Sequence, residues 1–507
     1  MKTPTLISAA ALALLAGCTV GPDYAPPKID APKSFIEATT DAPAADGAWW
    51  RSFGDKELDS LIERASKANT SVRVALARLR EARAQRGVVS SALFPHVDAN
   101  GSFSNSRFSE NGFLKGLGGP SSGGGSLPGA IIPGQQINLY QVSLDASWEI
   151  DIFGGQRRAV QAAEADLAAA EYDTGDVLRS VLAEVADGYI QLRGLQTRLS
   201  LAQSTADSEQ KTVEVLREQA KAGIASDFDL ARAQTQAATA AARVPDLDAA
   251  VHVAIRRLEV LLGQMPGTLS DELTASAPIP AAPDALAVGI PSETLRRRPD
   301  IRAAERRLAA ASAHIGEATA DLFPRFSLTG SFGLQSQKIE DLPKGDSRFW
   351  LVGPAVRWPI LDFGRIRSNI NVQNARTQEA EAAYEGTILQ ALSDVEVALV
   401  RLSRERQRSA QLDQAAQAAD RSLAIAQDQY RNGVLEYTDL LDAQRTQDVA
   451  KDAAAQSQAA LASDSIALFK ALGGGWLEAA EANAAPQPPS ARSNALMTDH
   501  EALTINH

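Results

Sequence analysis

The hydrophobic positions of this chain follow two periods, and each period predicts a different element. Over residues 181–199, apolar side chains recur at intervals of three and four, which is the spacing of one face of a helix. The intervals 134–244 and 360–485 contain no proline, so nothing in them interrupts a helix. The pattern predicts one long helix over about 155–221 and a second over about 365–431. Each would be roughly 100 Å long at 1.5 Å per residue.

The second period is two, and it predicts strands with one apolar and one polar face. Strands of about ten residues with two such faces fit a transmembrane barrel, with lipid against the apolar face and water against the polar face. A half-buried sheet of a soluble protein is the alternative. Four strands cannot close a barrel, and open edges leave backbone groups unpaired in lipid, so a membrane sheet requires at least a dimer. The alternating stretches are 95–107, 140–150, 326–335 and 350–360.

One segment of the chain occurs twice. Trp148 and Trp358 are separated by 210 positions (358 − 148), and Gly223 and Gly433 are separated by the same interval (433 − 223). Upstream, the two Leu-Phe-Pro sequences are separated by 229 positions (322 − 93). A register held over so long a stretch indicates rigid elements, because loops would have changed in length. The chain is therefore a duplicated unit.

Each long helix is followed by a glycine turn and a shorter helix. The turns AGIASDFDL and NGVLEYTDL place Gly223 and Gly433 where a helix C-terminal glycine belongs. A descending and an ascending short helix, stacked end to end, would match one long helix in length. The predicted short helices are about 227–263 and 437–473 after the turns, and about 57–92 and 292–322 before the strands.

The first residues predict export and lipidation. Lys2 and the apolar run 6–16 are typical of a signal peptide, and the run is too short to span a bilayer as a mature helix. A small-residue pair directly before Cys18 is the pattern of a lipobox, in which that cysteine carries a diacylglycerol and an N-acyl chain. An ordinary signal peptide with a free thiol is the alternative. Cys18 is the only cysteine, so no intramolecular disulfide can form. Thr19, which is not acidic, favours sorting to the outer membrane.

Composition and charge exclude several classes of function. The net charge of −12 offers nothing to nucleic acid. No later apolar run is long enough for a transmembrane helix. The five histidines show no metal-ligand spacing, and no nucleophile or nucleotide motif is present. We therefore expect neither an enzyme, a metal site nor a cofactor beyond the lipid on Cys18. The Gly/Ser/Pro-rich run 114–134 predicts an extracellular loop rather than a phosphate-binding loop.

Several motifs together resemble one known family. They are CTVGPDYAPP from Cys18, LRRRPDIRAAERRL from Leu295, two Leu-Phe-Pro strand starts, two Phe-Gly helix starts, and DLLDAQ from Asp439. The chain is similar, up to about residue 474, to the outer-membrane factors of TolC/OprM type, in the branch of efflux lipoproteins (NodT-type). The resemblance implies a membrane α+β fold, in which a trimeric twelve-stranded outer-membrane β-barrel continues into a long periplasmic α-helical barrel. Each protomer would supply four strands.

The resemblance also implies a function and partners. The homotrimer would be the exit duct of a tripartite RND-type efflux system in a Gram-negative outer membrane. It would passively pass drugs or toxic small molecules from an inner-membrane pump and a periplasmic membrane-fusion adaptor to the exterior. The alternatives are an exit duct for type I protein secretion and a non-channel structural lipoprotein that spans the periplasm. Two-faced strands favour a channel, because a scaffold has no need of a lipid-facing band.

Candidate gate residues lie at the turn of the second repeat. Asp439 and Asp442 are three apart on one helical face. In a trimer they would form two carboxylate rings, whose repulsion favours cations or a closed, partner-dependent state. Interaction with the helix dipole is the alternative role. By resemblance, Tyr430 is the tyrosine of the family's gate network, but Leu435 stands where that network has an arginine.

The first repeat places Asp227, Asp229 and Arg232 at the corresponding turn. Arg232 carries the opposite charge to its mate in the second repeat. We therefore expect Arg232 to pair with a carboxylate of a neighbouring helix and to hold the tunnel closed. Gly223 and Gly433 are the candidate adaptor-docking residues, although helix termination alone also explains glycine at both positions.

The sequence predicts six segments. They are a signal peptide (1–17), a lipidated N-terminal extended segment (18–54), the first repeat (55–265), a Pro-rich inter-repeat linker (266–289), the second repeat (290–474) and a disordered C-terminal tail (475–507) with no core-forming pattern.

Overall fold

The computed structural model describes residues 19–28, 32–37, 47–107, 109, 136–283 and 289–477. The signal peptide, Cys18, the run 114–134 and the tail beyond residue 477 lie outside these residues. The chain forms two compact units, and several helices contribute to both. Unit 1 comprises residues 1–26, 82–167 and 307–381, and unit 2 comprises residues 27–81, 168–306 and 382–507.

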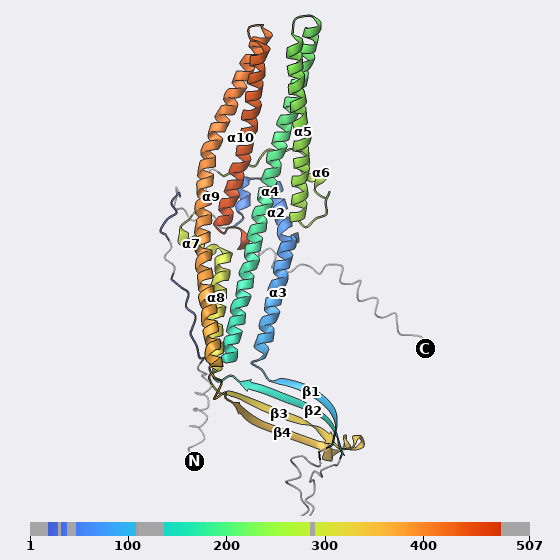
Figure 1. Ribbon diagram of the computed structural model, residues 1–507, viewed down its shortest axis with the longest axis vertical. Helices are drawn as coiled ribbons and strands as arrows, with labels where there is room; N and C mark the ends of the chain where they lie inside the picture. The colour runs from blue at the N-terminus through green and yellow to red at the C-terminus, as the bar shows by residue number, and fades with distance from the viewer. Residues whose placement is uncertain are drawn as a thin grey trace, which may run out of the picture. The chain divides into compact units, whose positions relative to one another are not determined.

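Unit 1 contains one antiparallel sheet in the order β1-β2-β3-β4 (Figure 1). The four strands are His96–Arg107 (β1), Gln136–Ile150 (β2), Arg325–Ser336 (β3) and Arg348–Arg357 (β4). The four predicted strands are therefore present. Large apolar side chains on one face of the sheet are exposed, and they include Phe103, Val142, Leu144, Phe332, Trp350 and Val352.

The polar face of the sheet has a hydrogen-bonded centre at Asp145. Its carboxylate accepts hydrogen bonds from the side chains of Asn100 (2.6 Å) and Ser143 (3.1 Å). Ser331 on β3 donates a third hydrogen bond to the same carboxylate (2.5 Å). Three strands are thus joined by side chains on the face opposite the apolar one.

In each repeat, a tryptophan at the end of the second strand forms a hydrogen bond to the turn between the preceding helix and the first strand. The indole Nε1 of Trp148 donates to the carbonyl of Leu93 (3.0 Å), and that of Trp358 donates to the carbonyl of Leu322 (3.1 Å). Both acceptors lie in the helix-to-strand turns. Because carbonyls at a helix C-terminus lack intrahelical partners, the two indoles satisfy groups that would otherwise be unpaired.

Four long helices supply most of unit 2 (Figure 1). They are Gly155–Lys221 (α4), Asp227–Leu261 (α5), Arg365–Arg431 (α9) and Tyr437–Ala471 (α10). Both 67-residue helices agree with the predicted bounds. The apolar helix face predicted over residues 181–199 is buried in the core of this unit, where Val181, Val185, Tyr189 and Leu192 are 4% exposed or less.

The two ascending helices are each broken, so the prediction of single helices over 57–92 and 292–322 was wrong. The first is divided into Lys56–Ala68 (α2) and Thr70–Ser91 (α3), and the second into Pro291–Arg297 (α7) and Pro299–Ala320 (α8). Their breaks, Asn69 and Arg298, are equivalent positions of the repeat (298 − 69 = 229). Both residues have extended ψ angles, 134° and 123°. Asn69 caps α3 with its side chain, and Arg298 precedes a proline, which disfavours the helical conformation.

Each break binds the end of a descending helix. The side-chain amide of Asn69 donates to the carbonyl of Leu261 at the end of α5 (2.7 Å). Nη1 of Arg298 donates to the carbonyl of Ala471 at the end of α10 (3.1 Å). The breaks therefore supply hydrogen-bond donors to helix C-termini, where carbonyls have no partner of their own.

No helix in the described ranges has the length and apolarity needed to cross a membrane. The remaining described elements are short: Trp49–Phe53 (η1), Ser270–Leu273 (α6), Ile339–Asp341 (η3) and Gly345–Ser347 (η4).

Candidate functional site

The candidate gate residues lie around two turns at one end of unit 2, one joining α4 to α5 and one joining α9 to α10 (Figure 1). Gly223 and Gly433 both have φ of +70°, a conformation that costs side chains other than glycine. The N–H of Ile224 donates to the carbonyl of Gln219 (2.8 Å), as expected for a helix that ends at a left-handed residue. Helix termination therefore accounts for both glycines, and the space next to each is open.

The helix after the first turn begins with a reciprocal cap. Ser226 Oγ accepts a hydrogen bond from the N–H of Asp229 (3.0 Å) and donates to its carboxylate (2.6 Å). The corresponding residue of the second turn, Glu436, occupies the N-cap position without a side-chain cap bond. The Asp229 carboxylate is thus bound at the start of α5, where the helix dipole stabilises a negative charge.

Asp439 and Asp442 lie on the exposed side of α10, and Asp227 is exposed at the start of α5. The two leucines between the α10 aspartates, Leu440 and Leu441, are buried. Within the part of the protomer that the structure describes, none of the three carboxylates accepts a side-chain hydrogen bond or forms an ion pair. The pair on α10 is consequently available to a partner, to a cation or to solvent.

Tyr430 lies at the end of α9 and is half-buried. Its hydroxyl donates to the side-chain oxygen of Gln219 on α4 (3.4 Å), and its ring centroid is 6.1 Å from that of Tyr437. Burial raises the pKa of Tyr430, and the negative charge of Asp229 raises it further. The structure thus brings together two of the predicted residues, Tyr430 and Asp229.

Sequence reasoning missed Gln219 and Tyr437. Tyr437 is buried at the start of α10, and burial, followed by the charge of Glu209, raises its pKa to about 12. The available signal was the comparison of the repeats, because Tyr437 occupies the position of Asp227 (437 − 210). An aromatic residue that replaces a polar one at a helix start indicates burial.

Arg232 does not pair with a carboxylate within the protomer. Its guanidinium lies over the ring of Phe228, 5.6 Å from the centroid, on the same face of α5. Such a contact is favourable because the aromatic face carries partial negative charge. Among the described residues Arg232 forms no ion pair, so the expected pairing with a neighbouring helix stays a prediction for an assembly.

The segment that follows Cys18 is bound to the start of α4 in unit 1, although Cys18 itself lies outside the described residues. The N–H of Val20 donates to the carbonyl of Phe153 (3.1 Å). Arg158, which is buried, donates to the carbonyl of Val20 (3.1 Å) and to the carboxylate of Asp23 (2.8 Å). A buried guanidinium with these partners fixes the chain within a few residues of the predicted lipid site.

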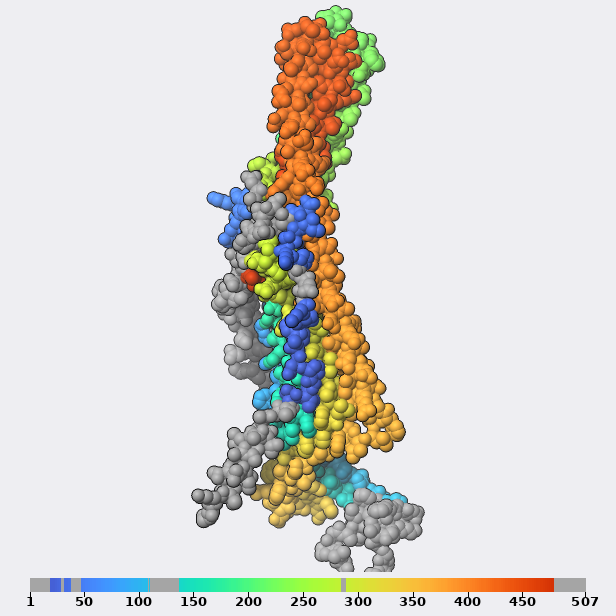
Figure 2. All heavy atoms as spheres, turned by 90° about the vertical axis from the view of Figure 1, so that its left-hand side faces the viewer, coloured from blue at the N-terminus to red at the C-terminus, as the bar shows by residue number. Residues whose placement is uncertain are grey.

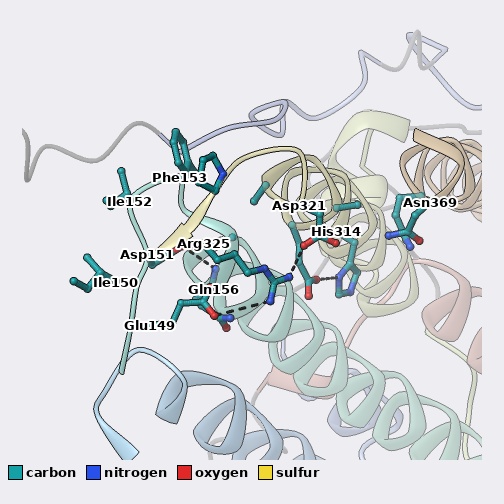
Figure 3. Close-up of a pocket in the computed structure, with 16 residues that line it drawn as sticks. Glu149, Ile150, Asp151, Ile152, Phe153, Gln156, His314, Asp321, Arg325 and Asn369 are labelled. Carbon is teal, nitrogen blue, oxygen red and sulfur yellow. Dashed lines mark hydrogen bonds and ion pairs between the residues drawn. The ribbon is translucent and has the colours of Figure 1, made fainter. Parts of the chain in front are cut away.

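A cavity of about 180 Å³ lies in unit 1 where β2, β3, α8 and α9 meet (Figure 3). Its charged residues are already paired: His314 with Glu317 (2.8 Å) and Arg325 with Asp321. The hydrogen bond that His314 donates to the Glu317 carboxylate raises the pKa of His314. The described residues contain no group of His, Cys, Asp and Glu that could hold a metal ion. The cavity is therefore an internally paired polar space.

Comparisons with known proteins extend over nearly the whole chain. The sequence model of a family described as outer membrane efflux protein matches residues 61–264 and 290–474. Nodulation protein T of Rhizobium leguminosarum bv. trifolii is 31% identical over 92% of this chain and 97% of its own length. Outer membrane protein OprJ of Pseudomonas aeruginosa is 33% identical over 94% of this chain and 98% of its own length.

Two solved channels have a similar structure. The outer-membrane channel OprN superimposes with a TM-score of 0.81 at 35% identity, over 90% of this chain and 100% of that one. The open state of the MtrE outer membrane channel of Neisseria gonorrhoeae superimposes with a TM-score of 0.79 at 30% identity, over 90% of this chain and 99% of that one.

Proposed function

This chain belongs to the outer membrane efflux protein family, and we propose that it forms the exit duct of a tripartite, RND-type efflux system. It passes drugs or toxic small molecules passively to the exterior. The observation that carries the proposal is the presence, in one chain, of a sheet with an exposed apolar face and two helices of 67 residues. Helices of that length extend about 100 Å, which suits a duct that leads from a membrane sheet into the periplasm.

We propose that three protomers assemble. The sheet of one protomer has two outer strands, β1 and β4, and no described residue pairs with the outer edge of either. Open strand edges are not tolerated in lipid, because their amides and carbonyls have no partner there. Three copies of the four-stranded sheet supply twelve strands, which is within the range of closed membrane barrels.

The periplasmic adaptor is proposed to dock at the two turns and to connect the duct with the inner-membrane pump. Gly223 and Gly433 leave open space, and the adjacent side chains of Ile224 and Val434 are exposed. Exposed apolar residues beside a backbone without a side chain offer a close approach to another protein.

The proposed gate consists of Asp439 and Asp442 of each protomer, supported by Tyr430, Asp227, Asp229 and Arg232. In the trimer the two exposed carboxylates repeat around the axis as rings. Their mutual repulsion favours the binding of cations, and it makes the closed state depend on bound partner proteins. Cys18 is proposed to carry a diacylglycerol and an N-acyl chain that anchor the protein in the outer membrane.

Conductance of the purified protein in planar bilayers tests both the channel and the gate. We expect a cation-selective pore for the native protein. Replacement of both Asp439 and Asp442 by Ala removes the carboxylate rings, so we expect a larger open conductance and a weaker preference for cations. The matched control replaces Asp246 and Asp248, two exposed carboxylates farther along α5, by Ala.

Each outcome distinguishes the candidates. Unchanged conductance and selectivity in the α10 double variant would contradict the gate but leave the channel. No conductance from any form of the protein would contradict the channel and favour a structural lipoprotein. Equal effects of the α5 control and the α10 variant would show that only net charge matters.

A further inference from the structure

A polar cluster is buried where α4 packs against α10 in unit 2. We call this contact the hairpin seam, because it joins the α4–α5 hairpin to the α9–α10 hairpin. An apolar cluster closes it toward the turns, with Val213 and Leu216 from α4 and Leu441 from α10. Farther along, the hydroxyl of Thr205 on α4 donates to the carboxylate of Asp448 on α10 (2.8 Å). The space-filling view shows α9 and α10, in orange and red, adjoining each other at the same end of the unit (Figure 2).

Glu209 lies within the seam, one helical turn beyond Thr205. Its side chain is 1% exposed, and its Oε2 has no hydrogen-bond partner. Two more buried oxygens have no partner on the facing side of α10: the side-chain oxygen of Gln444 and the hydroxyl oxygen of Tyr437. The amide oxygen of Gln444 can only accept, and a protonated carboxyl supplies an O–H donor that a carboxylate lacks, whereas the hydroxyl of Tyr437 can donate to either form. Protonation of Glu209 therefore supplies a donor to a buried acceptor that the ionised form cannot satisfy.

Burial and the nearest negative charge also favour the protonated form of Glu209. Burial raises the pKa of Glu209 to about 7, the negative charge of Asp448 adds to the shift, and Arg445 opposes it. Both charged residues lie on α10. Asp448 is itself faced by Arg243 of α5 and Lys451 of α10, and burial raises its pKa despite them. The seam therefore holds one buried acid, Glu209, and one half-buried acid, Asp448, and no cation among the described residues forms an ion pair with Glu209.

Comparison of the repeats indicates that the acid is not required for packing. The equivalent of Glu209 in the second repeat is Ala419 (419 − 209 = 210), which is also buried. Alanine fills this position of a long helix without an unpaired polar group. A buried acid without a partner costs free energy, so its presence in one copy only points to a role other than stability.

We propose that Glu209 is a proton-binding residue of the hairpin seam, which keeps the two hairpins packed when it is protonated and loosens them when it is ionised. The inference deepens the proposed channel function, because it makes separation of the hairpins at the turns depend on periplasmic pH. The packed seam holds the proton more tightly than an opened, hydrated seam. Packing is therefore fully favoured at pH below 4.5, and the advantage is lost as the pH rises through about 7.

The size of the effect follows from the difference between the ordinary pKa of 4.5 and the raised pKa of about 7. The ratio of opened to packed seams is expected to rise about tenfold between roughly pH 6 and pH 8. Over the complete titration the rise is limited to about 300-fold.

Thiol labelling of the assembled protein measures this ratio directly. A cysteine in place of Val213, which is 2% exposed, reacts with a maleimide only when the seam opens. A cysteine in place of Val215, which is 53% exposed on the same helix, corrects for the pH dependence of the thiol itself. The unsubstituted protein reports any labelling of Cys18. We expect the ratio of the two rates to rise about tenfold from roughly pH 6 to pH 8.

Glu209→Gln keeps the size and hydrogen-bonding capacity of the side chain but cannot ionise, so its ratio is expected to stay constant with pH. The control Glu214→Gln changes an exposed carboxylate on the same helix and is expected to behave like the native protein. The proposal is overturned if the ratio of the two labelling rates does not change with pH in the protein that retains Glu209. It is also overturned if the ratio rises equally in Glu209→Gln. If Glu209→Gln does not assemble, the pH dependence of the labelling ratio in the protein that retains Glu209 tests the proposal.

Conductance recorded over the same pH range separates this inference from the channel function. A conducting protein with a flat labelling profile retains the channel and overturns the role of Glu209. A rising profile in a protein that never conducts supports the seam and contradicts the duct.

Discussion

At the scale of single residues, Arg298 shows how this fold accommodates a buried charge. Its side chain is 3% exposed, and it donates to the carbonyl of Ala471 at the end of α10. It also binds Asp300 (2.6 Å) and Asp394 (3.1 Å). The cost of removing a guanidinium from water is offset only when such partners are all in place.

Replacement of Arg298 by Met is expected to lower the free energy of unfolding by about 1–3 kcal/mol, because it removes the donor to the carbonyl of Ala471 and the main counter-charge of the half-buried Asp300 and Asp394. Denaturant unfolding of the purified protein, followed by circular dichroism, measures the loss. The control Arg296→Met changes an exposed arginine two residues away, and its effect is expected to stay within about 0.5 kcal/mol. Equal unfolding midpoints for the two variants would contradict the argument.

Local chemistry of the candidate site was partly readable from the sequence. The glycine turns and the Ser226 cap follow from rules that involve neighbouring residues, and both are present. Glu209 and Gln219 could not be found in that way. Their environment depends on which faces of α4 meet α9 and α10, and sequence spacing along one helix does not contain that information.

At the scale of elements, the two 67-residue helices were predictable because no proline lies within them and a glycine turn follows each. The breaks in the ascending helices were missed for two different reasons. Pro299 was a readable signal, since the residue before a proline avoids the helical region. Asn69 gave no such signal, because its role depends on the carbonyl of Leu261, 192 positions away.

Replacement of Asn69 by Ala tests the role of the break. The change removes the cap of α3 and leaves the carbonyl of Leu261 unpaired, so we expect the free energy of unfolding to fall by about 1–2 kcal/mol. The exposed neighbour Thr70, replaced by Ala, is the control. Thermal unfolding monitored by circular dichroism would count against this role if the two variants melted at the same temperature.

At the scale of the whole molecule, the predicted fold class is confirmed: a protein of the outer membrane that combines long helices with a small antiparallel sheet, in the manner of the solved channels. Duplication made this predictable, because one recognised unit determined half of the chain. The sequence also predicted which face of the sheet is apolar, since alternation is a property of neighbouring residues. The number of protomers could not be predicted from the strands of one chain, because an open four-stranded sheet requires partners without fixing how many.

A pair of substitutions on β2 tests which face of the sheet meets lipid. Leu144→Arg places a charge on the exposed apolar face, at an expected cost of about 2–4 kcal/mol near the middle of a bilayer. We therefore expect a marked loss of assembled protein in the outer membrane. Ser147→Arg places the same charge on the polar face, where water can solvate it, and is expected to assemble normally. Membrane fractionation followed by native electrophoresis measures both, and the reverse order would assign lipid to the polar face.

The two breaks form joints of different chemistry. Asn69 joins the start of α3 to the end of α5 by one side-chain bond, whereas Arg298 joins α8, α9 and α10 through Ala471, Asp300 and Asp394. The joint of the first repeat is therefore a neutral hydrogen bond, whereas that of the second is an ionic junction of three helices. Duplication has thus yielded one neutral joint and one charged joint from the same position of the repeat.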